Sequence, residues 1–193
     1  QEYQTMSVRH CTILPFTRLL GGPMDFTPGI FEMDLSKTAP GNTTKKQATI
    51  ANQLGLYLTM YSPLQMAADT PENYFKRMDA FQFIKDVPLD WSKSKYIDAE
   101  PGEFIIVARK DKNSENWYAG GVNADVARPV DLDLDFLEPG VKYEAVIYAD
   151  GKKADAIDNP HDYKITRRKV TAKDIIKLRM ARGGGFAIQF VKL

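Results

Sequence analysis

The sequence has almost no cysteine, no long hydrophobic run and no excess of charge of one sign. One cysteine, Cys11, among 193 residues excludes an internal disulfide framework and a cysteine-rich zinc site. No stretch reaches the roughly 18 consecutive apolar residues of a membrane-spanning helix, so we expect no membrane span. Lysine and arginine number 26 against 25 acidic residues. Proteins that bind nucleic acid usually carry a basic excess, so we expect no nucleic-acid partner.

The composition that remains is that of an ordinary folded protein. Hydrophobic residues make up 44% of the chain and charged residues 26%, which is enough apolar material for a core and argues against disorder. The length suits one large domain or two small ones. The chain opens on Gln1 with no initiator methionine and no signal peptide. This opening fits either a processed N-terminus or a piece of a longer chain.

Residues 1–86 alternate between candidate strands and candidate helices. Short apolar runs at 11–16 and 64–68 are typical of buried strands. Apolar residues at helical spacing predict one helix over 45–61, opened by a capping box at Thr44, and another from Pro71 to before Pro88. Two such units cannot close a sheet, whereas a (β/α)8 barrel has eight of them in roughly 250 residues. We therefore interpret residues 1–86 as the C-terminal fragment of a (β/α)8 barrel, containing its last two βα units.

The remainder of the chain favours an all-β domain. Residues 87–101 are expected to be a linker with Trp91 as its packing anchor, and residues 102–193 an antiparallel β-sandwich. Trp91 and Trp117 could stack on sugar rings, but a tryptophan beside a linker or inside a sandwich belongs more often to the core. The expected strands are 104–108, 117–119, 130–136, 143–149, 162–170, 175–181 and 186–191.

Three acidic residues are candidates for chemistry. A (β/α)8 barrel holds its active site at the carboxyl ends of its strands, and pairs of carboxylates there carry out glycoside hydrolysis. Asp25 and Asp69 follow the two strand candidates, and Glu2 precedes the first. Three acids in loops are by themselves more often ordinary surface residues. Arg18 and Asp25 are better interpreted as a buried ion pair that fixes the long 17–43 loop.

One long segment resembles a known family. Residues 10–29, HCTILPFTRLLGGPMDFTPG, are similar to the LPFTR…GPMDYTPG block of glycoside hydrolase family 97, and the resemblance extends through residues 119–122. That family consists of bacterial α-glucosidases and α-galactosidases, typical of gut Bacteroidetes. The resemblance implies an N-terminal β-super-sandwich, a central (β/α)8 barrel and a C-terminal antiparallel β-domain. On this basis the chain is the C-terminal part of such an enzyme.

The same resemblance assigns candidate site residues. Residues 1–3 match the end of the family motif E-x-x-R-G-x-E-Y, which makes Glu2 the candidate catalytic general acid and a candidate ligand of calcium. The earlier members of that motif and the second catalytic carboxylate would precede residue 1. His10 is a candidate contact for sugar hydroxyls, and a structural hydrogen-bonding role for it is equally open. Residues 7–10 depart from the Pro-Glu-His that the family often shows.

The resemblance implies an exo-acting enzyme that cleaves α-glucosidic or α-galactosidic bonds by carboxylate acid/base chemistry. Its implied partners are an oligosaccharide substrate and the upstream part of the same enzyme. Its implied location is periplasmic or secreted, and the isolated chain would be inactive. Two alternatives stay open: a non-catalytic carbohydrate-binding or barrel-capping β-sandwich module, and a small α/β protein fused to a sandwich.

Overall fold

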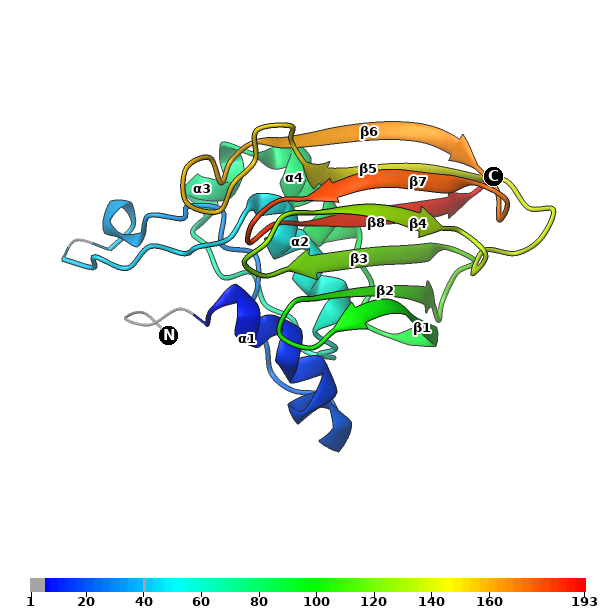
Figure 1. The fold of residues 1–193 in the computed structure, drawn as a ribbon, viewed down its shortest axis with the longest axis horizontal. Coiled ribbons are helices and arrows are strands. Elements are labelled where there is room, and N and C mark those ends of the chain that lie inside the picture. The colour runs from blue at the N-terminus through cyan, green and yellow to red at the C-terminus, as the bar shows by residue number, and fades with distance from the viewer. Residues whose placement is uncertain (1–5, 40) are drawn as a thin grey trace.

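Two antiparallel sheets packed face to face make up most of the molecule (Figure 1). The computed structural model describes residues 6–39 and 41–193. Within them, β4 (Arg128–Asp133) pairs only with β7 (Ile175–Met180) to form the smaller sheet. The larger sheet has six strands in the order β1 (Trp91–Glu100), β2 (Phe104–Asp111), β3 (Trp117–Asn123), β8 (Gly185–Lys192), β5 (Tyr143–Asp150) and β6 (Tyr163–Val170).

Helices cover the other face of the larger sheet, so its central strands β3, β8 and β5 are buried on both sides, while its edge strands β1 and β6 are largely exposed (Figure 1). Helix α2 (Ile50–Thr59) packs on β3 and β8, and all of its residues are buried. It is followed by α3 (Pro71–Phe75) and α4 (Met78–Asp86). Before it come α1 (Val8–Ile13) and short 3-10 helices at Leu14–Phe16, Arg18–Gly21 and Leu35–Lys37.

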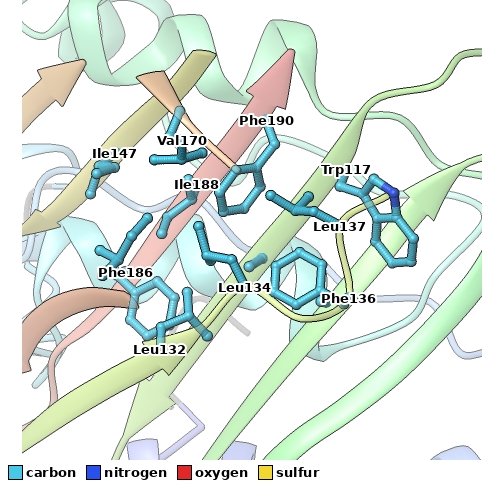
Figure 2. Close-up of a cluster of buried hydrophobic side chains, with 14 of the residues drawn as sticks. Trp117, Leu132, Leu134, Phe136, Leu137, Ile147, Val170, Phe186, Ile188 and Phe190 are labelled. Atoms are coloured by element: carbon cyan, nitrogen blue, oxygen red, sulfur yellow. The ribbon is translucent and has the colours of Figure 1, made fainter. Parts of the chain in front are cut away.

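Alternation along the strands separates the core that faces the smaller sheet from the buried residues that face the helices. In β5, Ala145 and Ile147 face the smaller sheet, while Val146 and Tyr148 face the helices. Figure 2 shows the first core, where β8 meets the chain at the end of β4. Its labelled side chains are Trp117, Leu132, Leu134, Phe136, Leu137, Ile147, Val170, Phe186, Ile188 and Phe190. Burial of this aromatic and aliphatic surface drives the sandwich to form.

Helix α2 approaches the sheet unusually closely and is held at its C-terminal end. A Cβ placed on Gly55 would lie 2.6 Å from the carbonyl oxygen of Gly121, so only glycine allows this approach. The buried guanidinium of Arg109 donates from Nε to the carbonyl oxygen of Leu58 at 2.7 Å and from Nη1 to Ser94 Oγ at 2.6 Å. A cation at a helix C-terminus satisfies free carbonyls there.

Each strand expected after residue 102 is present, although the one expected over 130–136 spans Arg128–Asp133, and the expected linker is wrong. Residues 91–100 form β1, an edge strand paired antiparallel with β2. Its lysines and serines hide the strand pattern because an edge strand carries polar residues that discourage further pairing. The ladder is also irregular, with register shifts near Trp91 and Tyr96. Trp91 does act as a packing anchor, edge-on to Tyr118 at 5.6 Å between ring centroids.

The two strands expected before residue 86 are not present as predicted. Residues 11–16 are helical: Ser7 Oγ accepts the backbone N–H of His10 at the start of α1, and Pro15 lies in the first turn of the next 3-10 helix. Residues 64–68 contribute one isolated parallel bridge, between Phe26 and Gln65. Before Trp91, the described residues form isolated β-bridges and no strand, so the structure does not show the expected part of a barrel. A parallel strand pairs with a segment that is distant in the sequence, and a local apolar run does not show whether that segment is present.

The helix expected over 45–61 exists but begins later. Thr49, rather than Thr44, is its N-cap, and its hydroxyl accepts the backbone N–H of Asn52 at 3.1 Å. The segment ahead of it, residues 44–48, is extended or turned and contributes to the site described next.

Candidate functional site

A cavity of about 700 Å³ lies between the segment 24–30, the loop around 35–42 and helix α2. Its wall is mostly apolar, with a few polar groups, as is common in small-molecule sites. The polar side chains are Asp25, Thr27, Thr38, Asn42, Lys46 and Gln53, and the apolar ones include Met6, Met24, Phe26, Ile30, Leu35 and Leu56.

Lys46 is the buried cation of this wall. Its Nζ donates to the carbonyl oxygen of Met6 at 2.7 Å, and its backbone N–H donates to the carbonyl oxygen of Met33. Burial lowers the pKa of Lys46, and burial likewise raises the pKa of the neighbouring Cys11 thiol. Lys46 therefore joins Met6 to the loop before α2.

Asp25 is the one carboxylate that lines the cavity among the described residues. Its side chain is exposed. Glycoside hydrolysis needs two carboxyl groups on opposite sides of the scissile bond. The described part of the chain therefore offers a wall suited to polar and apolar ligand contacts, but not a complete pair of catalytic carboxylates.

Side chains make hydrogen bonds to most of the backbone N–H and C=O groups of residues 28–32. Gln53 Oε1 accepts the N–H groups of Gly29 and Ile30, both at 3.2 Å. Tyr57 donates to the carbonyl oxygen of Pro28 at 3.2 Å, and Tyr74 donates to that of Gly29 at 2.7 Å. Burial raises the pKa of Tyr74 to about 12, which keeps its hydroxyl protonated as a donor.

Asp69 completes the same arrangement. Its Oδ2 accepts the backbone N–H groups of Phe31 and Glu32, both at 2.7 Å. Its Oδ1 accepts the backbone N–H of Thr70 and the side-chain amide of Asn73. All these bonds use the carboxylate as an acceptor, so Asp69, a candidate acid on sequence, serves to fix the loop.

The chain is similar to known proteins in sequence and in fold. Residues 90–191 match the family model described as "Glycosyl-hydrolase 97 C-terminal, oligomerisation". The chain belongs to glycoside hydrolase family 97. The resemblance seen in residues 10–29 is therefore confirmed, and the chain corresponds to a C-terminal portion of the family's proteins.

Relatives of this family-97 chain are considerably longer. A retaining α-galactosidase of Bacteroides thetaiotaomicron is 33% identical over 189 residues, which are 94% of this chain and 27% of that protein. A probable retaining α-galactosidase of Streptomyces bingchenggensis is 30% identical, over 97% of this chain and 26% of that protein. A family-97 enzyme from Pseudoalteromonas sp. strain K8, solved with panose, is 47% identical with a TM-score of 0.91. The alignment covers 97% of this chain and 29% of that enzyme.

Of the other candidate residues of this family-97 chain, the structure describes His10 and Arg18 but not Glu2. Glu2, the candidate general acid and calcium ligand, lies outside the described residues. His10 is exposed on α1 and is not among the residues that line the cavity. The predicted buried Arg18–Asp25 pair is wrong, because both side chains are exposed and Arg18 donates to the carbonyl oxygen of Gly22. The backbone of residues 28–32 in this loop is held by Gln53, Tyr57, Tyr74 and Asp69, and not by an Arg18–Asp25 ion pair.

Both tryptophans of the family-97 chain pack on other aromatic side chains, Trp117 buried and Trp91 partly buried. Trp117 is 5% exposed and lies 5.4 Å from the ring of Phe136. Trp91 packs on Tyr118. Neither provides the exposed aromatic platform that a carbohydrate-binding module would need.

Sequence reasoning missed a buried polar junction at the N-terminus of α2. Asp150, at the end of β5, accepts the Thr49 hydroxyl on Oδ1 at 2.7 Å. Its Oδ2 accepts the N–H groups of Ala181 and Gly185 at 2.7 and 2.8 Å. The residue is partly exposed, but its carboxyl group is enclosed, and this burial raises its pKa to about 6. In the sequence, Asp150 followed by Gly151 is typical only of a hairpin turn.

This junction predicts a pH-dependent stability. Asp150 has a folded pKa of about 6, above the 3.8 of an unperturbed aspartate, so the folded chain binds more protons between these values. The protonated Asp150 carboxyl therefore adds to the free energy of unfolding below pH 4, and this contribution is lost as the pH rises through 6. In Asp150→Asn the amide oxygen can accept the two backbone N–H groups, and the amide NH2 can donate to Thr49 Oγ1 in place of the present bond from Thr49. We expect this variant to remove about 2 kcal/mol of the pH dependence. Urea denaturation of the chain from pH 4 to 7 measures it.

The matched control is Asp131→Asn, which changes an exposed aspartate on β4. In this control, the free energy of unfolding should change with pH as steeply as in the unsubstituted chain. An equal slope in the Asp150→Asn variant would show that the Asp150 carboxyl is ionised in the folded chain throughout this range.

Proposed function

We propose that this chain is the C-terminal part of an exo-acting glycoside hydrolase that cleaves α-galactosidic or α-glucosidic bonds. Family membership carries the proposal. It is supported by relatives named as retaining α-galactosidases and by the 47% identical enzyme solved with panose, an α-glucoside. The chain spans under three tenths of the length of these proteins, so an activity of the whole protein needs further residues.

We also propose that segments 24–28 and 64–68 are the last two strands of the enzyme's (β/α)8 barrel. They run parallel: Phe26 bridges Gln65, the N–H of Ala68 donates to the carbonyl oxygen of Pro28, and that of Met24 to Tyr61. Helix α2 lies between them in the chain, which is the order of a βαβ crossover. On this proposal the cavity opens at the carboxyl end of the first strand, where barrels hold their active sites.

The upstream part of the same enzyme is the partner that this arrangement requires. Leu20, Leu64 and Met66 are exposed by 79%, 58% and 46%, close to the two short parallel segments. An upstream barrel would cover such side chains and supply the missing strands. It would also supply the second carboxylate.

Glu2, His10 and calcium keep the roles that the family resemblance implies: general acid, sugar contact and assisting ion. Among residues 6–39 and 41–193, no group of three or more histidine, cysteine, aspartate or glutamate side chains could hold a metal. A calcium ion would therefore take its ligands from Glu2 and the upstream chain. We propose a periplasmic or secreted location on the resemblance alone. No helix in the described ranges is both long and apolar enough to cross a bilayer.

The proposal predicts activity for the full-length protein and none for residues 1–193 alone. Both are assayed with p-nitrophenyl α-galactoside and p-nitrophenyl α-glucoside. Hydrolysis needs both carboxylates and a closed barrel, so the isolated chain should remain at background. Turnover by the isolated chain would contradict the incomplete site, and no turnover by the full-length protein on either substrate would contradict the proposed function.

A further inference from the structure

The connection between β5 and β6, together with Tyr163 at the start of β6, contacts three different parts of the N-terminal segment. The carbonyl oxygen of Pro160 accepts the N–H of Ile50 in the first turn of α2 at 3.1 Å. His161 Nε2 lies 2.9 Å from the carbonyl oxygen of Phe31. The Tyr163 hydroxyl donates to Asp79 in the first turn of α4 at 2.7 Å. The sandwich therefore reaches across both proposed βα units at the end where their helices begin.

The His161 contact completes the hydrogen bonding of residues 28–32. A carbonyl oxygen can only accept, so Nε2 of His161 must carry the hydrogen that it donates to Phe31. The ring is half-buried, and this burial lowers the pKa of His161, which favours the neutral donor form. The other contacts to this loop come from α2, α3 and Asp69, whereas His161 comes from 130 residues further along the chain.

Residues of this loop also line the cavity. Thr27, Pro28 and Ile30 are part of the cavity wall, and the Phe31 carbonyl follows directly behind them. Side chains placed on a loop are only as well positioned as the backbone that carries them. The hydrogen bond from His161, which lies outside the cavity wall, can therefore affect a ligand inside the cavity.

We propose that His161 is a positioning residue through which the C-terminal sandwich sets the affinity of the cavity for a sugar. It holds the Phe31 carbonyl and thereby fixes the wall formed by residues 27–30. The proposal rests on the proposed function, because it takes the cavity to be part of a glycosidase site. It makes the sandwich a structural part of substrate binding in addition to a cover for the barrel.

The test compares three variants of the full-length enzyme. His161→Leu removes the donor, His161→Gln retains an amide donor of similar reach, and Lys152→Ala changes an exposed residue of the same connection. A neutral hydrogen bond is worth about 1 kcal/mol, so we expect His161→Leu to raise KM roughly 3- to 10-fold with kcat little changed. His161→Gln and Lys152→Ala should stay close to the unsubstituted enzyme.

Hydrogen–deuterium exchange gives a readout that does not depend on activity. In His161→Leu, the amides of residues 29–32 should exchange faster, while those of β3 and β8 should not change. Unchanged KM and exchange would overturn the proposal, as would an equal loss in His161→Gln or faster exchange throughout the sheet. If His161→Leu does not fold, His161→Asn, which is too short to reach the carbonyl, replaces it. If the unsubstituted enzyme shows no turnover, the proposed function fails, and exchange alone decides the role of His161.

Discussion

In the full-length enzyme, Glu2→Gln is expected to slow hydrolysis of a natural disaccharide on the order of 10²–10⁴-fold, the usual contribution of general acid–base catalysis. A sugar is a poor leaving group, so its departing oxygen needs a proton, and the amide of glutamine cannot supply one. A p-nitrophenyl glycoside should lose far less rate, because its leaving group departs readily as an anion. The ratio of the two losses, measured as kcat/KM, is the informative quantity.

Glu72→Gln is the matched control, because Glu72 is an exposed glutamate of α3. It should hydrolyse both substrates at the rate of the unsubstituted enzyme. Equal losses on both substrates in Glu2→Gln would assign Glu2 to holding a metal or the fold. No loss on either would show that the motif match at residue 2 is wrong.

Gly55→Val is expected to lower the free energy of unfolding by about 3 kcal/mol or more, at the upper end of overpacking effects. A Cβ at this position would lie 2.6 Å from the carbonyl oxygen of Gly121 and 2.9 Å from that of Phe186. Both atoms belong to central strands of the sheet, so neither can move without disturbing the ladder between β3 and β8. The helix must move away instead. For a chain of this size the melting temperature should fall by roughly 6–12 °C.

The sign of the stability change at Gly55 distinguishes close packing against the sheet from helix propensity. Gly55→Ala in an exposed helix would stabilise by about 1 kcal/mol, whereas here we expect it to destabilise the chain. Gly21→Ala is the control, because no atom lies within 4 Å of a Cβ built at Gly21. Thermal denaturation of Gly55→Val, Gly55→Ala and Gly21→Ala gives the order of their stabilities. A Gly55→Ala variant as stable as the original chain would contradict the close approach of α2 to β3.

The function of the sandwich can be stated in terms of these contacts. Arg109 and Asp150, both on the larger sheet, hold the two ends of α2, and His161 holds the loop ahead of it. Each side chain satisfies backbone or side-chain groups that would otherwise be buried without a partner. The sandwich thereby fixes the position of a helix and a loop that border the cavity.

The sequence by itself determined the β-sandwich, the helical character of residues 50–59 and the family. Residues 130–133 alternate in β4, and apolar residues recur at helical spacing in α2, because the side-chain period of a strand or helix is a local property. The family followed from twenty consecutive residues, 10–29, and required no knowledge of their conformation. The same residues include the segment 11–16 that was wrongly expected to be a strand.

Only the tertiary structure decided what depends on a remote partner. Residues 91–100 form a strand because β2 pairs with them, and residues 11–16 are helical, with Ser7 capping the start of α1. Asp69 proved to hold a loop 37 or 38 residues away in the chain, and His161 to reach one 130 residues away. Local periodicity carries no information about such distances, because strand pairing, burial and hydrogen bonding are settled by which segments the fold brings together.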